Sequence, residues 1–457
     1  MEIKPTEDLA RFAAELGYAD LPGSARDYAR LLLVDSIACA LASDYGQETA
    51  MYARFARAAG GAGETTVIGS QEGLSLLGAS LLNGYLITAA TVCDSYVPAH
   101  VHITPEVVPP ALAVAERDRL DGKALLAAIA IGAEVAVRVA DGIDYTVAGP
   151  RGWHMPGIVG PFGAAAAVGN LRGLTSLQMR NALALAGSQS AGTWASWGTP
   201  TVKFHQSRGA VSGLLAGLLA EQDFSASAEI LAHPDGGIFA AYSNGGDPAA
   251  AVAGLGERFA FEGISLRLWP GGTPLQPTLT AVFELLATHE PAFAAIERVR
   301  IEVAPDVYEA HARFAEPEGT FDALLSYPFT VAAALRDGRF WLDSIGPAKI
   351  GDPDLRRFMR DRVALVSNPA LTREHSRVEV TVGSETLGAM AEGAKGSPAN
   401  PATADELRIK FDHAVAGRMA GRDAAELLDL LFRIDECDDL GRLFELLRSA
   451  RERVVGP

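Results

Sequence analysis

Residues 93–102, CDSYVPAHVH, bring a carboxylic acid, a phenol and two imidazoles together within a short stretch of the chain. Its Asp94, His100 and His102 could bind a metal, transfer protons or cap a helix. Histidine titrates near neutral pH and can therefore act as a general base or a general acid. The apolar, alanine-rich residues that follow predict that this stretch is a loop leading into a helix.

A metal site is one alternative for these histidines. His100 and His102, with Glu106 after a gap of three residues, have the spacing of the ligand run of a cupin. Side chains two positions apart share a face only on a β-strand, and the sequence around them has almost no strand pattern. We therefore expect no metal at this site.

Titratable residues also stand ahead of two further apolar helices. His154, shortly before Pro156, could be catalytic or could only form a hydrogen bond at the start of its helix. Lys203, His205 and Arg208 precede the second helix, whose free N–H groups would add to their attraction for an anion. These three residues predict a pocket for a carboxylate, and a solvated basic turn is the alternative.

Arg267 is a further candidate for binding a carboxylate. The sequence also lacks the usual motifs of nucleotide-binding proteins and serine hydrolases. Arg267 lies beside the Gly/Pro-rich residues 269–278, at a predicted domain junction, where it could hold a carboxylate through two parallel hydrogen bonds. GSQSAG at residues 187–192 lacks the Lys-Ser/Thr of a phosphate loop, and neither G-x-G-x-x-G nor G-x-S-x-G occurs. Nucleotide binding and serine hydrolysis are therefore not expected.

Composition narrows the possible partners. The chain has 457 residues, with 39 Lys and Arg against 56 Asp and Glu, and a formal net charge of −17. That charge argues against nucleic acid or an anionic membrane as partner, whereas a few local cations suit a small anionic substrate. The three cysteines form no Cys-x-x-Cys pair, which argues against a zinc or iron–sulfur site and fits a reducing compartment. Without a signal-peptide pattern or a membrane-spanning apolar run, we expect a cytoplasmic protein.

Helices must position most of these residues. Leu9, Phe12 and Leu16 mark one face of a first helix, and Glu134 and Arg138 have the i,i+4 spacing of an ion pair on another. The density of Gly and Ala should let such helices approach one another closely. Further helices are predicted at residues 24–43, 121–142, 160–173 and 176–192.

The pattern changes near residue 263. Residues 298–309 and 375–387 alternate apolar and polar side chains as half-buried strands do, and residues 326–338 predict a buried helix between them. Residues 426–454 return to an amphipathic helix, which we expect to pack back onto the first domain.

These patterns predict a mainly α protein. Its large all-helical domain is formed by both chain ends, residues 1–262 and 404–457, and residues 263–403 form a smaller inserted α+β lid domain. A cleft between two domains is a common place for a small ligand to bind.

Seven segments occur in the order and spacing of one protein family. They are DSIACALAS, the His102 stretch, GWHMPGIVGPFGAAAA, NALALAGSQSAG, the Lys203 stretch, SYPFTVAAALRDG and RVEVTVG. Over nearly the whole chain they resemble the MmgE/PrpD family, which includes 2-methylcitrate dehydratase, cis-aconitate decarboxylase and iminodisuccinate epimerase. The resemblance implies a helical domain built from both chain ends, an α+β lid, a homodimer and catalysis without a cofactor.

The resemblance also assigns site residues one by one. His102 matches the histidine that follows the family's D-F-D-D-T stretch, and Asp94 matches the second acid of that stretch. His154 matches the histidine of the family's G-[FW]-H motif. Lys203 matches the lysine before its L-H segment, although one residue is missing between Lys203 and His205.

Several positions depart from the family pattern. Val92 stands in place of the first acid and Tyr96 in place of a threonine. In the lid, the K-P-Y-P run begins with Arg267, and Gln276 stands in place of a histidine. Glutamine cannot titrate, so if that histidine delivers a proton in the decarboxylase, this chain should decarboxylate cis-aconitate poorly.

The reactions of the family move a proton on a carbon next to a carboxylate or an equivalent electron sink. The resemblance therefore implies a cofactor-free carbon-acid enzyme that acts on a small di- or tricarboxylate. The favoured activity is that of a lyase of the 2-methylcitrate dehydratase type, ahead of cis-aconitate decarboxylase. The alternatives are an epimerase or isomerase of a dicarboxylate such as iminodisuccinate, and a non-catalytic protein that binds a polycarboxylate. The predicted catalytic residues are His102, His154, Lys203, Asp94 and Tyr96, and the predicted substrate ligands are Lys203, Arg208, Arg267 and Gln276.

Overall fold

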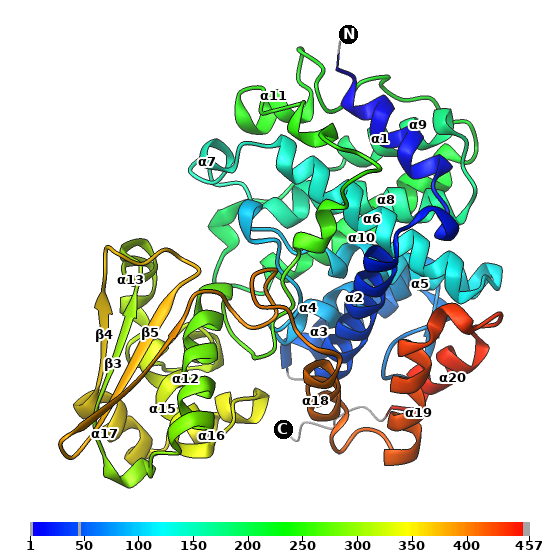
Figure 1. Cartoon of the computed structure of the whole chain (residues 1–457). Helices are drawn as coiled ribbons and strands as arrows, with labels where there is room; N and C mark the ends of the chain where they lie inside the picture. Colours follow the sequence, from blue (N-terminus) through cyan, green and yellow to red (C-terminus); the bar gives the residue numbers. More distant parts are fainter. Residues whose placement is uncertain (1–2, 44–46, 451–457) are drawn as a thin grey trace. The chain divides into compact units, whose positions relative to one another are not determined.

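Figure 1 shows the computed structural model of the chain, which describes residues 3–43 and 47–450. Contacts within the chain divide it into two compact units. The first contains the chain up to Ile264 and again from Leu407, and the second is Ser265–Glu406. Helices predominate in the part described, so the predicted mainly α class is confirmed. None of the described helices is both long enough and apolar enough to span a bilayer.

The first unit consists mainly of helices. A two-stranded antiparallel sheet, β1 (Ala62–Thr66) and β2 (Gly73–Leu74), interrupts the series, so the predicted all-helical composition is wrong at this point. Glycine permits this pairing, because a Cβ on Gly63 would lie 2.5 Å from the carbonyl oxygen of Leu74. The helices up to Ile264 are α1 (Pro5–Glu15), α2 (Gly23–Ala42), α3 (Gln47–Gly60), α4 (Leu76–Ala89), α5 (Thr104–Asp118), α6 (Gly122–Gly142), α7 (Tyr145–Ala148), α8 (Met155–Leu171), α9 (Ser176–Gly187), α10 (Thr201–Ala220) and α11 (Ile238–Ser243), with short 3₁₀ turns between some of them.

Small residues bring the central helices close together, as predicted. α6 and α8 meet at Gly132 and Gly163, where a Cβ on either glycine would lie 2.7 Å from the carbonyl oxygen of the other. α10 approaches α8 in the same way, because a Cβ on Gly213 would lie 2.5 Å from the carbonyl oxygen of Pro161. Side chains on these three helices are therefore held by backbones in direct contact.

The predicted pair of Glu134 and Arg138 is confirmed, and it is buried. The Arg138 guanidinium lies 2.6 Å from a Glu134 carboxylate oxygen, and both side chains are 0% exposed. Arg138 also donates to the carbonyl oxygens of Ala253 and Arg258, and the N–H of Phe261 donates to Glu134. The pair thus satisfies its own charges and fastens the irregular segment after α11 to α6.

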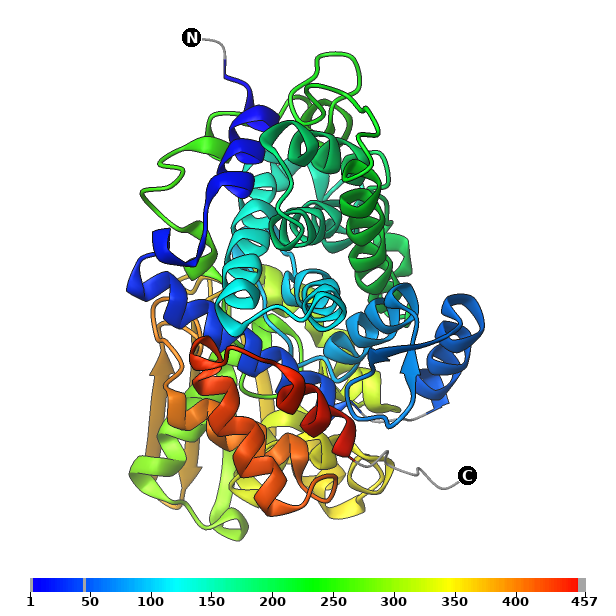
Figure 2. The same cartoon turned by 90° about the vertical axis from the view of Figure 1, so that its right-hand side faces the viewer.

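Residues 407–450, here called the C-terminal arm, return to the first unit and contact α2. The arm contains most of α18 (Ala404–Val415), with α19 (Gly421–Phe432) and α20 (Gly441–Ser449). α19 contacts α2, as Figure 2 shows. The amphipathic segment predicted at residues 426–454 is therefore two helices rather than one, and its residues 451–454 lie outside the described part.

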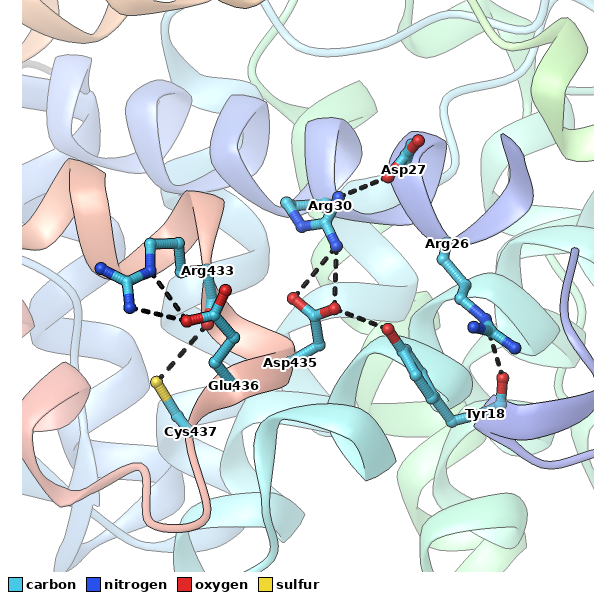
Figure 3. Close-up of polar contacts among 8 residues, drawn as sticks. All are labelled: Tyr18, Arg26, Asp27, Arg30, Arg433, Asp435, Glu436 and Cys437. Atoms are coloured by element: carbon cyan, nitrogen blue, oxygen red, sulfur yellow. Dashed lines mark hydrogen bonds and ion pairs between the residues drawn. The ribbon is translucent and has the colours of Figure 1, made fainter. Parts of the chain in front are cut away.

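Polar contacts fix the arm near both ends of α2. Near the beginning of the helix, Arg30 donates to both carboxylate oxygens of Asp435 at 3.0 Å, and the hydroxyl of Tyr18 donates to the same group at 2.6 Å (Figure 3). Near its end, the buried guanidinium of Arg418 donates to the carbonyl oxygens of Leu41 and Ser43. These last bonds satisfy carbonyl groups that the end of a helix leaves without an intrahelical partner.

The second unit contains a four-stranded mixed sheet in the order β4-β3-β5-β6. β3 pairs parallel to β4 and antiparallel to β5, and β5 and β6 form a hairpin. α12 and α15 pack against the sheet and each other. The strands are β3 (Ile296–Val303), β4 (Val363–Ser367), β5 (Ser376–Val382) and β6 (Glu385–Ala391), and the helices are α12 (Gln276–His289), α13 (Pro305–His311), α14 (Thr320–Ala323), α15 (Tyr327–Asp337), α16 (Pro347–Ile350) and α17 (Pro353–Arg362).

Three predictions for this unit can be compared with its elements. The buried helix predicted at residues 326–338 is confirmed as α15. The strand predicted at residues 298–309 ends early, because Pro305 starts α13. The stretch 375–387 is not one strand, since Gly383, with φ 59°, turns the chain between β5 and β6.

Candidate functional site

The loop between α4 and α5 fixes both Asp94 and His102. The carboxylate of Asp94 accepts hydrogen bonds from the N–H groups of Ile103 and Thr104 at 2.8 and 3.1 Å, and from the Thr104 hydroxyl. Asp94 therefore caps the start of α5. Its carbonyl oxygen lies 2.6 Å from Nδ1 of His102. A carbonyl oxygen only accepts, so Nδ1 of His102 carries the hydrogen, and Nε2 is the basic nitrogen of the ring.

His154 and His205 form a second group of imidazoles. His154 stands immediately before α8, as predicted, and its Nδ1 lies 3.1 Å from Nδ1 of His205, on α10. Only one of the two Nδ1 atoms can donate in this bond. The two neutral rings must therefore be complementary tautomers, one with a basic Nε2 and the other with an Nε2–H group.

Burial keeps this histidine pair neutral. Burial, and then the charges on His205 and His102, lowers the pKa of His154 to about 3. Burial and the neighbouring Arg208 lower the pKa of His205 as well. Near neutral pH the pair can therefore accept one proton and donate another without carrying a standing charge.

The loop after α9 closes over the pair. The N–H of His154 donates to the carbonyl oxygen of Gly192 at 3.1 Å. Gly192 has a φ of 151°, and a Cβ there would lie 3.0 Å from Nδ1 of His205. Arg208 holds the same loop, because its guanidinium donates to the carbonyl oxygens of Gln189 and Ala191 at 2.7 and 2.8 Å. It also reaches the carbonyl oxygen of Gly157 and the hydroxyl of Ser212.

The position of the cations relative to α10 corrects the sequence prediction. α10 begins at Thr201, so Lys203 and His205 lie inside its first turns rather than ahead of it. Nothing in TVKFHQ breaks a helix, and the polar residues therefore continue the apolar segment that follows. The Lys203 ammonium donates to the carbonyl oxygen of Ala89, at the end of α4, at 2.9 Å. Burial lowers the pKa of Lys203.

Tyr96 and His100 have separate partners. The hydroxyl of Tyr96 donates to the carboxylate of Asp141 at 2.6 Å. Burial, followed by this bond to Asp141, raises the pKa of Tyr96, so the phenol stays protonated. The ring of His100 stacks on Tyr145 with 4.4 Å between centroids, in line with its interpretation as a structural neighbour of His102. The predicted catalytic role of Tyr96 stays a prediction.

Arg267 and Gln276 belong to the second unit. The guanidinium of Arg267 donates to the carbonyl oxygen of Gly271 at 2.9 Å. Gln276 starts α12, and its amide donates to the carbonyl oxygen of Trp269 at 3.0 Å. Both residues thus line the same Gly/Pro-rich loop within that unit. That they bind substrate stays a prediction.

The sequence did not indicate two features of this site. The pairing of His205 with His154 depends on how α8 and α10 pack. Glu106, in the first turn of α5, is 0% exposed, and neither carboxylate oxygen has a hydrogen-bond partner among the described residues. Burial, and then the charge of Asp94, raises its pKa well above the usual value.

Among the residues that the structure describes, no cluster of three or more His, Cys, Asp or Glu could hold a metal ion.

Comparison with known proteins places the chain in a family. The model of the MmgE/PrpD N-terminal domain matches residues 7–251, and that of the MmgE/PrpD C-terminal domain matches residues 269–433. The chain belongs to the MmgE/PrpD family. The predicted resemblance is therefore confirmed, and the matched residues of the N-terminal MmgE/PrpD domain include His102, His154 and Lys203.

Curated relatives in the MmgE/PrpD family are distant in sequence. Cis-aconitate decarboxylase of Aspergillus terreus is 29% identical over 277 residues, which cover 58% of this chain and 56% of that enzyme. The match thus spans little more than half the length of the Aspergillus terreus enzyme. Cis-aconitate decarboxylase of Mus musculus is 27% identical over 392 residues, 81% of this chain and 78% of that enzyme. A cis-aconitate decarboxylase-like protein of Aspergillus oryzae is 24% identical and covers 97% of both chains.

Proposed function

We propose that this protein is a carbon-acid enzyme, a lyase that removes a proton next to a carboxylate of a small di- or tricarboxylate. The observation that carries the proposal is the buried, hydrogen-bonded pair of His154 and His205, with His102 fixed nearby as a single tautomer. Relatives that are named as decarboxylases of cis-aconitate support a polycarboxylate substrate. The proposal needs no cofactor, because the imidazoles supply both the base and the acid.

The proposed reaction is the loss or addition of water, of the 2-methylcitrate dehydratase type. A basic Nε2 takes the proton from the carbon next to the carboxylate, and the electron pair of that C–H bond forms the new carbon–carbon double bond. The hydroxyl on the adjacent carbon leaves with its bonding electrons and takes a proton from the Nε2–H of another imidazole, so that water departs. His102 suits the base, and the histidine pair suits the acid, because one of its rings carries hydrogen on Nε2.

Cations must hold the carboxylate groups while this happens. We assign this role to Lys203, whose ammonium is on α10 in the same turn as His205. We assign Asp94 to capping α5 and Arg208 to holding the loop over the histidine pair, because their polar atoms already bind protein groups. The sequence predicts Arg208 as a substrate ligand and Asp94 as a catalytic group. Their contacts with the loop and with the start of α5 favour these supporting roles instead.

An epimerase or isomerase of a dicarboxylate is the second candidate. The complementary tautomers of His154 and His205 favour it, because inversion of a carbon centre needs an acid and a base in one site. Decarboxylation of cis-aconitate takes third place despite the names of the relatives, since Gln276 stands where the family has a histidine. A protein that only binds a polycarboxylate is the remaining alternative.

A homodimer is part of the proposal. The outer sides of α9 and α10 form a groove of about 500 Å³ lined by Leu185, Leu215, Leu218 and Leu219 among others. Leu215 and Leu219 are 43% and 41% exposed in the single chain. Large apolar side chains gathered in an exposed groove are typical of an interface, and a second copy of the chain is the occupant that we propose.

The experiment that tests the function is proton NMR in D₂O with the purified protein and a panel of 2-methylcitrate, cis-aconitate, citrate, tartrate and iminodisuccinate. A new alkene or a hydrated product would establish the lyase and name its substrate. Deuterium entering an unchanged skeleton, with a second diastereomer, would establish the epimerase instead. Thermal stabilisation by a panel member without any exchange would contradict both and identify a binding protein.

A further inference from the structure

A buried ion pair contacts the loop between α4 and α5, here called the site loop. The ammonium of Lys410, in the C-terminal arm, is 2.5 Å from a carboxylate oxygen of Asp35 on α2. It is also 2.8 Å from the carbonyl oxygen of Val92. The two charged side chains are 1% and 0% exposed. The thiol of Cys39 contacts the same carboxylate and the same carbonyl oxygen at 3.5 Å each.

The loop that receives this contact has an unfavourable backbone. Thr91, immediately before Val92, has a φ of 53°, and His100 has a φ of 51°. A β-branched residue rarely adopts the left-handed conformation, because its side chain crowds the backbone there. The loop therefore relies on contacts from other elements to keep its shape, and the bond from Lys410 reaches the residue next to Thr91.

The same loop sets the ring of His102. Val92 is two residues before Asp94, whose carbonyl oxygen accepts from Nδ1 of His102 at 2.6 Å and whose carboxylate caps α5. A shift of the backbone at Val92 would move that carbonyl oxygen away from the ring. Nε2 of His102 would then no longer be fixed as the basic nitrogen.

We propose that Lys410 is a positioning residue for His102: it holds the carbonyl group of Val92, and the loop so fixed presents the carbonyl group of Asp94 to the imidazole. The catalytic meaning of this arrangement rests on the proposed function, whereas the arrangement itself does not. Stability alone explains the pair poorly. Burying two charges costs much of what their attraction returns, and well-packed apolar residues of similar volume often serve a fold as well.

The test compares two double variants by NMR of selectively ¹⁵N-histidine-labelled protein without substrate. Asp35→Leu/Lys410→Met removes the buried pair but fills its volume. Arg30→Met/Asp435→Leu is the matched control, because it breaks another contact of the same arm with the same helix, in which the other partners are Asp27 and Tyr18 rather than the loop (Figure 3). The signals of His102 are identified by their loss in His102→Gln, and thermal unfolding checks that each variant is folded.

We expect the first variant to lose the single Nδ1–H tautomer of His102, while the control keeps it. Turnover should fall about 10-fold or more in the first variant with little change in KM, because a displaced base affects the chemical step more than binding. An unchanged His102 tautomer in the first variant would overturn the proposal. A tautomer lost equally in both variants would also overturn it, since that result reports general loosening of the arm.

The experiment also tests the proposal if the first variant does not fold or if the wild-type protein converts no substrate. If the first variant does not fold, Asp35→Asn/Lys410→Gln replaces it, because it keeps hydrogen-bonding groups in the pocket while the shorter side chain withdraws from Val92. The same outcomes then apply to it. If the wild-type protein converts no member of the substrate panel, the proposed function fails, and the tautomer of His102 still decides whether Lys410 positions the ring.

Discussion

The imidazoles of His154 and His205 meet Nδ1 to Nδ1 at 3.1 Å, so a single hydrogen lies between two rings that are both buried. Each ring fixes the tautomer of the other. A change of tautomer in one ring therefore requires the opposite change in its partner. This coupling offers a way for the site to return to its starting state after one imidazole has taken a proton and another has given one.

His154→Gln tests the pair directly. We expect turnover to fall by about 100-fold or more with the fold intact, because a glutamine amide cannot give a proton to the departing hydroxyl as the imidazole pair does. His100→Gln is the control, since the ring of His100 stacks on Tyr145 rather than joining the pair. Steady-state kinetics with the substrate identified by NMR gives the comparison. Near-full activity of His154→Gln would return this residue to a structural role at the start of α8.

The pKa of His154 predicts how stability changes with acid. In the unfolded chain this imidazole titrates near 6.5, and in the folded protein near 3. Between these values the unfolded chain binds a proton that the folded protein does not. The free energy of unfolding should therefore fall as the pH falls from about 6.5 to about 3, by up to about 1.4 kcal/mol per pH unit from this residue.

Denaturant titrations of wild type and His154→Gln over that pH range provide the measurement. The variant should lose stability less steeply, because its side chain does not titrate. The carboxyl groups of the protein contribute equally to both curves, and the difference between the curves isolates the histidine pair. Parallel curves would mean that the folded protein accepts the proton on His154 without a penalty.

Glu106 predicts the opposite dependence. Burial raises its pKa above the usual 4.5, so the unfolded chain loses this proton at a lower pH than the folded protein does. Its contribution to stability is fully present below 4.5 and is lost as the pH rises towards the raised pKa. Glu106→Gln should therefore raise Tm at pH 8 by about 2–5 °C and change it little at pH 4.5.

The exposed Glu64→Gln is the control for Glu106 and should leave Tm unchanged at both pH values. Differential scanning calorimetry at the two pH values suffices. A loss of Tm at pH 8 on removing the acid would show that the carboxyl group of Glu106 has a partner that stabilises its charged form.

Substitutions of Lys203 and of Arg208 should have different effects on KM and turnover. Lys203→Met should raise KM most for the substrates with the most carboxylate groups, because it removes the cation assigned to them. Arg208→Met should lower turnover for every substrate and lower Tm, because it releases the loop over the histidine pair. KM and turnover measured for a dicarboxylate and a tricarboxylate separate the two patterns. Equal loss on all substrates in Lys203→Met would point to damage of its contact with α4.

The α9–α10 groove predicts a change of oligomeric state. Leu215→Glu/Leu219→Glu should convert a dimer into monomers, because it places two charges in the apolar groove. Ile409→Glu is the control, since Ile409 is also exposed but lies on α18. Size-exclusion chromatography with light scattering measures the mass. A dimer that persists in the groove variant would exclude this face as the interface.

Residues that start helices could be predicted well from the sequence. The stretches before α5 and α8 carry local signals, such as proline in the first turn and an abrupt change to apolar residues, and these signals predict that His102 and His154 stand just before helices. Even the capping role of Asp94, one of the alternatives at the outset, depends on neighbours only nine and ten residues away. Local chemistry determines such features.

Features that depend on packing could not be predicted in this way. His154 and His205 are 51 residues apart, and only the close approach of α8 and α10 brings their rings together. Lys410 reaches Val92 across 318 residues, and its segment reads as an ordinary amphipathic helix. β1, β2 and β4 were missed because short strands are defined by their partners rather than by their own residues.

The contacts of the C-terminal arm also bear on the order in which the protein forms during synthesis. α2, the site loop and the histidine pair all leave the ribosome long before Lys410, Arg418 and Asp435. Contacts between residues so far apart in sequence form late, because closing so long a loop costs chain entropy before any contact is gained. A nascent chain that has released residues up to Ile264 therefore still lacks the ammonium that contacts Val92. On the role proposed for Lys410, we expect the imidazole of His102 to reach its final orientation only when the arm has folded onto α2.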